Sequence, residues 1–283
     1  MDTGVKVRKI AGKTIIYLFL AVVVVITIFP ILYAFMGSFK SNAEASLGGT
    51  FFPQQWVFTN YYEAMQRFNF FRYTLNSLYV AFFTTVGSIF VASSAGYCIA
   101  RRDFPGKKLL MALYLSTMFV SVGALTMRPL YEMMVDVGLH NSLWGVILIQ
   151  IGAQGTNVFL VSKFVQGVPK EMDEAAVIDG CSFFRIYWQI IIPSIIPVLG
   201  VVGLFSFRGS WNDYVLPSIF TMAKPELRTL TVGVVSLKYT SDAAAEWNIM
   251  LTGASISILP MLIVYIFTNK TFIQGLTVGA VKG

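Results

Sequence analysis

The sequence predicts an all-α membrane protein with six transmembrane helices, on the evidence of its composition and of six long apolar stretches. Of its 283 residues, 56% are hydrophobic and only 12% are charged, whereas soluble domains average about 25% charged residues. A transmembrane helix needs about 20 apolar residues. Stretches of that kind occur at residues 15–35, 74–100, 109–127, 143–165, 190–216 and 249–268. They leave little sequence for a soluble domain, so we expect a single transmembrane domain over residues 1–283.

The distribution of positive charge is a third observation, and it predicts the orientation of these spans. The formal net charge is +7, and lysine and arginine gather in four segments. These segments contain Lys6, Arg8, Lys9 and Lys13; Arg101, Arg102, Lys107 and Lys108; Lys163, Lys170 and Arg185; and Lys270 and Lys282. Because cytoplasmic loops accumulate Lys and Arg, we expect all four segments, and therefore both termini, in the cytoplasm. The charge is then explained without a nucleic-acid partner.

The sequence also predicts the properties of three segments outside the core spans. The first span, residues 15–35, is longer than a signal-peptide core and lacks a small-x-small cleavage motif, so we expect it to be retained. Residues 230–237 are apolar but too short to cross a bilayer, and we expect an external or re-entrant segment there. The glycine-rich tail, residues 271–283, has the composition of a disordered end.

Residues that could carry metal binding or catalysis are scarce. Cys98 and Cys181 both fall on the predicted cytoplasmic side, where disulfides are rare, and His140 is the sole histidine. The chain contains no phosphate-binding loop, no Gly-x-Ser-x-Gly elbow and no His-Glu-x-x-His motif. We therefore expect no metal ion or cofactor in this chain, and we expect that it is not an enzyme.

The polar loop at residues 166–189 has the signals of a short helix. Pro169 suits a helix start, and acidic residues follow in the first turns, where the helix dipole favours anions. Gly180 can end the helix in the left-handed conformation, and Ser182 can cap the next one. At helical spacing, one face of this helix is small and slightly polar, and it contains Met172, Ala175, Ala176 and Asp179. Such a face suits docking into a groove of another protein; the alternative is an ordinary solvated connecting helix.

Polar residues also occur within the fourth predicted span. Gln150, Gln154 and Asn157 have the spacing i, i+4, i+7 and share one helix face. Because polar groups are costly in lipid, such residues normally turn toward a cavity or a partner helix. One hypothesis is that these amides line a path for a polar solute. The alternative is hydrogen bonding between helices.

A second polar cluster lies in the fifth predicted span. Arg208 and Asn212 are four residues apart, with Trp211 and Asp213 beside them. Sugars are bound by planar polar side chains and an aromatic face, which these residues and the amides of the fourth span supply together. We therefore expect both clusters to line a central solute path. For Arg208 the alternative is snorkelling to the membrane interface or pairing with Asp213.

Residues 174–193 resemble the EAA loop of ABC importer permeases. Its positions are matched at fixed spacing by Glu174, Ala175, Ala176, Gly180, Ile190, Ile192 and Pro193. Further matching motifs are Asn76-Ser77-Leu78, Arg101–Gly106, Pro129-Leu130-Tyr131 with Gly138-Leu139, Trp211-Asn212-Asp213 and the tail pattern Gly-Leu-Thr-x-Gly-x-Val-Lys-Gly. Over nearly its whole length the chain is similar to carbohydrate-type ABC importer permeases, and in particular to the shorter, six-span permease of maltose-type systems.

This resemblance implies the type I ABC importer architecture and import of a sugar or oligosaccharide across the bacterial cytoplasmic membrane. It implies a complex with a second permease subunit, two ABC ATPase subunits that bind ATP and Mg²⁺, and an extracytoplasmic solute-binding protein. In the family, the EAA helix docks in a cleft of the ATPase and couples its closure to the membrane helices. The resemblance gives that role to Met172, Glu174, Ala175, Ala176, Asp179 and Gly180. In maltose-type relatives the tail, here residues 275–283, also reaches between the ATPase subunits.

The chain departs from the maltose permease in two places. The loop at residues 131–142 is shorter, which puts in doubt a deep contact with the binding protein, and Cys181 stands where Ala is usual.

A permease for a non-sugar solute is one alternative function, because the EAA loop alone does not exclude it. An ion-coupled secondary transporter usually shows paired repeats and acidic groups at mid-membrane, but here Asp213 is the only acidic residue in a predicted span. An intramembrane enzyme lacks a catalytic constellation.

Overall fold

The computed structural model describes residues 3–119, 123–238 and 245–280. These residues form helices and no β-strand, which confirms the predicted all-α fold. The chain divides into two compact units. Unit 1 comprises residues 1–69 and 234–259, and unit 2 comprises residues 70–233 and 260–283.

Unit 1 contains the first predicted span. Its helices are α1 (Thr3–Gly37), α2 (Asn42–Leu47), α3 (Thr59–Arg67) and the first part, residues 247–259, of α15 (Trp247–Ala280). Within α1, residues Gly12–Gly37 are long and apolar enough to cross a membrane. Large apolar side chains on this segment are exposed, from Ile15 to Phe35. Such a surface is suited to contact with lipid tails.

A buried hydrogen-bond network fixes the loop that follows α1. The side-chain amide of Asn60 donates to the carbonyl oxygens of Ser38 and Lys40, at 2.8 Å each. The carbonyl oxygen of the Asn60 side chain accepts from Asn248 Nδ2 at 2.9 Å. The ammonium of Lys40, which is buried, donates to the carbonyl oxygen and the hydroxyl of Thr50. Because these buried polar groups have partners, they hold the loop in one shape.

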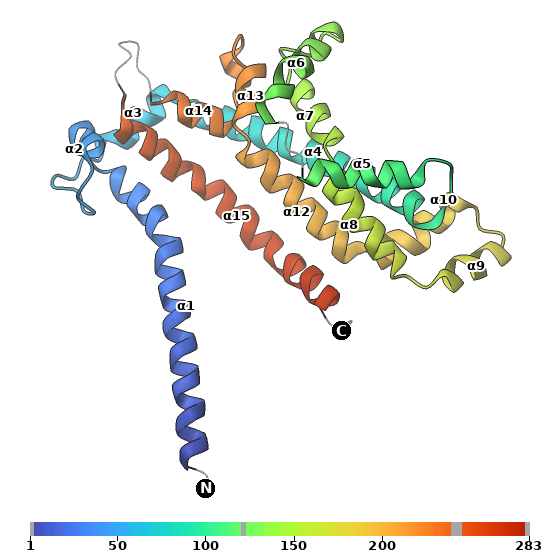
Figure 1. Ribbon diagram of the computed structural model, residues 1–283. Coiled ribbons are helices and arrows are strands. Elements are labelled where there is room, and N and C mark those ends of the chain that lie inside the picture. Colours follow the sequence, from blue (N-terminus) through green and yellow to red (C-terminus); the bar gives the residue numbers. More distant parts are fainter. Residues whose placement is uncertain (1–2, 120–122, 239–244, 281–283) are drawn as a thin grey trace. The chain divides into compact units, whose positions relative to one another are not determined.

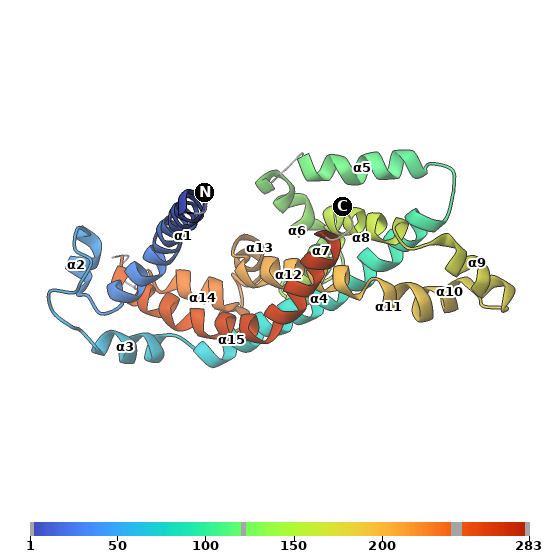
Figure 2. The same cartoon turned by 90° about the horizontal axis from the view of Figure 1, so that it is seen from below.

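Unit 2 is built around α4 (Phe70–Arg101), which packs mainly against α8 and α12 (Figures 1 and 2). The later helices are α5 (Lys107–Phe119), α6 (Met127–Asp136), α7 (Leu143–Gly152), α8 (Gly155–Gln166), α9 (Lys170–Ile178), α10 (Phe183–Ile186), α11 (Ile192–Ser194), α12 (Ile196–Asn212), α13 (Val215–Phe220) and α14 (Leu230–Ser236). Shorter segments are the 3₁₀ turns η1 (Gly123–Thr126) and η3 (Pro225–Leu227) and the π-helical η2 (Tyr187–Ile191). Within the apolar segment predicted to be too short for a span, residues 230–236 form the short helix α14, of which residues 230–233 belong to unit 2 and residues 234–236 to unit 1.

The crossing of α4 and α8 depends on a small residue. A Cβ atom at Gly96 would lie 2.8 Å from Val161 Cγ1 and 3.0 Å from the backbone nitrogen of Ser162. A larger residue would therefore force the helices apart, whereas glycine lets them approach closely. Val161 and Val165 of α8 are fully buried in the resulting core.

The described helices match the predicted spans unevenly. Besides α1, α4 is long and apolar enough to cross a membrane alone. Two further candidates are bent pairs, α7 with α8 at 47° and the α10–α11 segment with α12 at 80°. The second bend lies between Pro193 and Pro197, which lack the N–H that a continuous helix needs. The described residues thus contain two candidate spans, or four if each bent pair counts as one, and six spans stay a prediction.

Two expectations about the ends of helices need correction. The predicted span 109–127 is not one helix, because α5 ends at Phe119 and the described chain resumes as a 3₁₀ turn with Gly123 at a φ of +50°. The tail was predicted to be disordered, yet α15 continues through Ala280. Extending an existing helix costs less than starting one, so two glycines do not stop it. Residues 281–283 of the tail lie outside the described residues.

Candidate functional site

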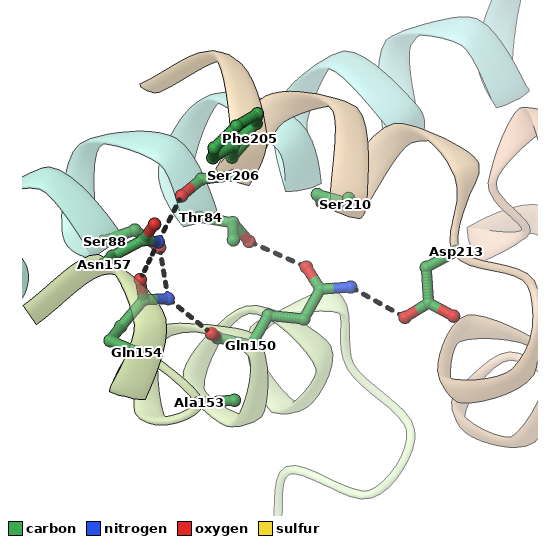
Figure 3. Close-up of a pocket in the computed structure, with 11 residues that line it drawn as sticks. Thr84, Ser88, Gln150, Ala153, Gln154, Asn157, Phe205, Ser206, Ser210 and Asp213 are labelled. Carbon is green, nitrogen blue, oxygen red and sulfur yellow. Dashed lines mark hydrogen bonds between the residues drawn. The ribbon is translucent and has the colours of Figure 1, made fainter. Parts of the chain in front are cut away.

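A cavity of about 260 Å³ lies within unit 2, between α4, the α7–α8 pair and α12 (Figure 3). Most of its lining residues have polar side chains, with amide, hydroxyl and carboxylate groups, and one has an aromatic ring. The lining residues are Thr84, Ser88, Gln150, Ala153, Gln154, Asn157, Phe205, Ser206, Gly209, Ser210 and Asp213. Asp213 is the one titratable residue in this set, so the lining residues carry no positive charge.

The cavity sits where one helix is broken. α7 ends at Gly152 and α8 begins at Gly155, and the two axes differ by 47°. Ala153 and Gln154 lie between the helices, and both line the cavity. Non-helical backbone at membrane depth is tolerated where it is buried in protein or lines a water-filled cavity. The break therefore places non-helical backbone beside the cavity.

Gln150 connects two walls of the cavity. Its side-chain oxygen accepts a hydrogen bond from the Thr84 hydroxyl of α4 at 3.0 Å. Its side-chain nitrogen donates to Asp213 Oδ2, at the end of α12, at 2.9 Å. The other carboxylate oxygen of Asp213 accepts from the backbone nitrogen of Leu216 at 3.4 Å, at the start of α13. Gln150 is therefore held in place from both sides (Figure 3).

Gln154 forms a second bridge one helical turn away. Its side-chain nitrogen donates to the Ser88 hydroxyl at 2.7 Å and to the carbonyl oxygen of Gln150 at 2.9 Å. Its side-chain oxygen accepts from Asn157 Nδ2 at 2.6 Å, and that same nitrogen lies 3.4 Å from the Ser206 hydroxyl. The network thus joins α4, α8 and α12, so it is also a set of interhelical hydrogen bonds of the kind that holds membrane helices together.

One lining group lacks a hydrogen-bond partner, and another is exposed. The hydroxyl oxygen of Ser210 is buried and has no hydrogen-bond partner among the described residues. Phe205 exposes 47% of its surface, so its ring can cover the apolar face of a solute. The described residues hold no group of three or more His, Cys, Asp or Glu that could bind a metal ion. The arrangement is suited to binding through hydrogen bonds and one aromatic face.

The residues predicted to line a solute path fall into two groups in the structure. Gln150, Gln154, Asn157 and Asp213 line the cavity together. Trp211 is instead buried and stacks on Phe207, with ring centroids 5.7 Å apart. Arg208 and Asn212 are exposed, and the Asn212 side chain donates to the carbonyl oxygen of Arg208 in its own helix.

Helical phase explains this division. The cavity face of α12 carries Ser206, Gly209, Ser210 and Asp213, at spacings i, i+3, i+4 and i+7. Arg208 and Asn212 belong to a different face of that helix. The sequence-based prediction omitted the small hydroxyl residues of the lining. A usable signal was present, because Thr84 with Ser88 and Ser206 with Ser210 are each four residues apart within apolar segments.

The helix predicted in the polar loop is α9, and its ends follow the predicted signals. Pro169 precedes the first residue, and Glu171 and Asp173 lie in the first turn. The helix is followed by Gly180 with a φ of +79°, a left-handed conformation that favours glycine. Ser182 Oγ then accepts a hydrogen bond from the backbone nitrogen of Arg185 at 3.3 Å and caps α10.

The surface of α9 differs from the predicted docking face at one residue. Ala176 is only 6% exposed and packs in the hydrophobic core of unit 2. Because it faces the core, it is not available to a partner protein. The remaining residues assigned to ATPase coupling are exposed: Met172, Glu174, Ala175, Asp179 and Gly180.

Comparison with known proteins identifies the family. The family described as binding-protein-dependent transport system inner membrane component matches residues 5–270. The arabinooligosaccharides transport system permease protein AraQ of Bacillus subtilis is 33% identical over 270 residues, covering 94% of each chain. The galactooligosaccharides transport system permease protein GanQ of the same organism is 30% identical, covering 100% of each chain.

A solved structure shares the fold. It is that of a bacterial ABC transporter involved in the import of the acidic polysaccharide alginate, with a TM-score of 0.74 and 22% sequence identity. The match covers 96% of this chain and 99% of that chain. By its sequence and its fold, this chain belongs to the family of inner membrane components of binding-protein-dependent transport systems.

Proposed function

We propose that this chain is a permease subunit that moves a neutral sugar or oligosaccharide across the cytoplasmic membrane in an ABC importer. It is an inner membrane component by family, and the relatives AraQ and GanQ are named for oligosaccharide transport. The observation that carries the proposal is the polar cavity at the break between α7 and α8. Its amides, hydroxyls and carboxylate can replace the water around a polyhydroxylated solute, while Phe205 covers an apolar sugar face.

The cavity is proposed as one half of the solute path. Gln150, Gln154, Asn157 and Asp213 line this half. Arg208 and Asn212 are exposed on another face of α12, and polar side chains facing lipid are unfavourable. In this proposal they face the second permease subunit, with Trp211 packed behind them. The alternative is that the hydrogen-bond network of the cavity serves only to join helices. The hydrogen bonds among its members are also consistent with this alternative.

The complete transporter, in this proposal, has the partners that the family description implies. A solute-binding protein delivers the solute, a second permease subunit completes the path, and two ABC ATPase subunits bind ATP and Mg²⁺ and hydrolyse ATP. The exposed motif residues of α9, including Glu174 and Asp179, dock on one ATPase subunit. Six spans place both termini in the cytoplasm, where the tail at residues 275–283 reaches the ATPase subunits.

Uptake by a reconstituted transporter tests this function. Proteoliposomes containing the two permease subunits and the ATPase subunits are supplied with the binding protein and with labelled maltotriose or arabinotriose. We expect uptake that requires internal ATP and the binding protein and that persists when ion gradients are collapsed. Uptake driven by an ion gradient without ATP would identify a secondary transporter instead. ATP-dependent uptake of an amino acid or peptide, with no sugar carried, would identify a non-sugar permease.

A further inference from the structure

The last turns of α4 carry a row of side chains that contact the loop containing α9. The row consists of Ser93, Tyr97 and Arg101, which are spaced by four residues and therefore share one face of the helix. Each of them contacts a different segment of the chain between α8 and α12. We call these three residues the anchor row.

Arg101 contacts the start of α9 at two points. Its Nε atom lies 2.6 Å from Asp173 Oδ2, in the first turn of α9. Its Nη2 atom donates to the carbonyl oxygen of Val168 at 2.8 Å, just before the helix. The side chain of Arg101 is 5% exposed and that of Asp173 is 17% exposed, so water screens this ion pair weakly. A planar guanidinium makes the two contacts through separate nitrogens in a fixed geometry, whereas a lysine ammonium has a single nitrogen on a flexible stem.

The other two members of the row hold the segment after α9. The ring of Tyr97 stacks on Phe183 of α10, with centroids 4.6 Å apart and an angle of 24°. The hydroxyl groups of Ser93 and Tyr187 are hydrogen-bonded at 2.7 Å, and both residues are buried. Tyr187 is the first residue of the π-helical segment η2. The anchor row therefore contacts α9, α10 and η2 in turn.

α9 itself has little other attachment to unit 2. Ala176 is the one buried residue of this nine-residue helix. Burying a single methyl group stabilises a contact only slightly, because hydrophobic stabilisation scales with the apolar area removed from water. The Arg101–Asp173 ion pair is therefore the principal contact that fixes the position of α9.

The same helix reaches the cavity. α4 is uninterrupted over its 32 residues, and further along it Thr84 and Ser88 form hydrogen bonds to Gln150 and Gln154. A continuous helix transmits displacement along its length with little deformation. A movement imposed on α9 would thus reach the cavity wall through α4, provided that the anchor row holds.

We propose that Arg101 and Asp173 are positioning residues, whose ion pair holds α9 to α4 so that displacement of α9 moves the cavity wall. The proposal rests on the proposed import function and assigns its coupling to a specific contact. Asp173 is not itself a docking residue in this view. Its carboxylate faces the protein, while Glu174 and Asp179 lie exposed to a partner.

Hydrogen exchange of the intact chain in lipid nanodiscs tests the contact without partners or solute. In Asp173→Asn, we expect the amides of residues 174–179 to exchange at least about tenfold faster than in the wild type, because loss of the partner leaves a buried charge unpaired and α9 opens more often. The matched control is Glu171→Gln, which removes the same charge from an exposed residue of the same helix turn. Equal exchange in the two variants would overturn the proposal.

A second variant provides the test if Asp173→Asn does not fold. Arg101→Lys keeps the charge but loses the fixed, planar arrangement of donors, so we expect faster exchange limited to residues 168–179. The charge reversal Arg101→Asp with Asp173→Arg is expected to slow this exchange again relative to either single reversal. If neither the lysine variant nor the pair of reversals changes exchange in this way, the ion pair does not fix α9.

Coupling of α9 to transport is measured separately. In the reconstituted importer, Asp173→Asn is expected to lower the amount of trisaccharide transported per ATP hydrolysed, whereas Glu171→Gln leaves this ratio unchanged. The ratio uses purified assembled complex and subtracts the hydrolysis seen without binding protein, so a lower yield of folded protein alone does not move it. Faster exchange with an unchanged ratio would show that the pair holds α9 but does not couple it. The exchange result stays valid even if the transported solute is not a sugar.

Discussion

Gln150 and Gln154 are held in the cavity by neighbours on α4 and α12, whereas Glu174 and Asp179 lie exposed on α9. Both sets are polar residues at helical spacing, and in the sequence they give the same kind of signal. In the cavity, mutual hydrogen bonds fix the positions of the side chains that line the proposed solute path. On α9, a single ion pair and one buried alanine leave the other side chains free for a partner. Burial, rather than residue type, separates the cavity from the proposed docking surface.

The substitution expected to have the largest effect on coupling through α9 is Gly180→Pro. Gly180 has a φ of +79°, whereas proline requires about −65°. Its backbone nitrogen also donates to the carbonyl oxygen of Val177 at 3.0 Å, and proline removes that donor. We expect background uptake and no stimulation of ATP hydrolysis by the loaded binding protein, with normal insertion of the chain into the membrane. Normal uptake by this variant would show that the geometry after α9 is not needed for coupling.

The shape of unit 2 can be tested at the contact between α4 and α8. Gly96→Val places side-chain atoms where Val161 and the backbone of Ser162 already lie, and overpacking of this kind destabilises by about 1–3 kcal/mol. We expect a lower melting temperature in detergent and a lower yield of assembled transporter. The matched control is Gly12→Val in α1, where an added Cβ meets nothing within 4 Å. Equal melting temperatures for the two variants would contradict the close approach of the helices.

The two groups of polar residues in the predicted path can be separated by a pair of variants. Gln150→Ala removes the contacts to Thr84 and Asp213, and we expect half-maximal uptake to need about twofold to tenfold more solute-loaded binding protein. Asn212→Ala removes only a bond within its own helix. We expect this variant to reduce co-purification of the second permease subunit. The concentration of solute-loaded binding protein that gives half-maximal uptake should stay unchanged. The reverse pattern would move the solute path to the face of Arg208 and Asn212.

Features set by local chemistry were predictable from the sequence. The all-α fold follows from the apolar stretches, and the ends of α9 follow from Pro169 and Gly180. The tail was not predictable, because its glycines favour disorder in isolation while the preceding helix extends into it. The inward turn of Ala176 and the outward turn of Arg208 depend on which neighbours pack against each helix. The anchor row depends on contacts between segments about 70 to 95 residues apart in the chain, as in Arg101–Asp173 and Ser93–Tyr187, and helical spacing alone does not reveal them.

The central claim, that the cavity is part of the solute path, is tested most directly by comparing Gln154→Ala with Gln166→Ala. Gln154 is buried in the cavity, whereas Gln166 is exposed at the other end of α8. On the same preparations, one measures the yield of assembled transporter and the ATP hydrolysis stimulated by each trisaccharide with its binding protein. We predict that Gln154→Ala keeps at least half of the yield but changes stimulation by about twofold to tenfold or alters the preferred sugar, and that Gln166→Ala changes neither. Gln154→Ala could instead lose yield while the surviving complex keeps its stimulation and sugar preference. That result would contradict a role of the cavity in the solute path and would show that the network serves to hold the helices together.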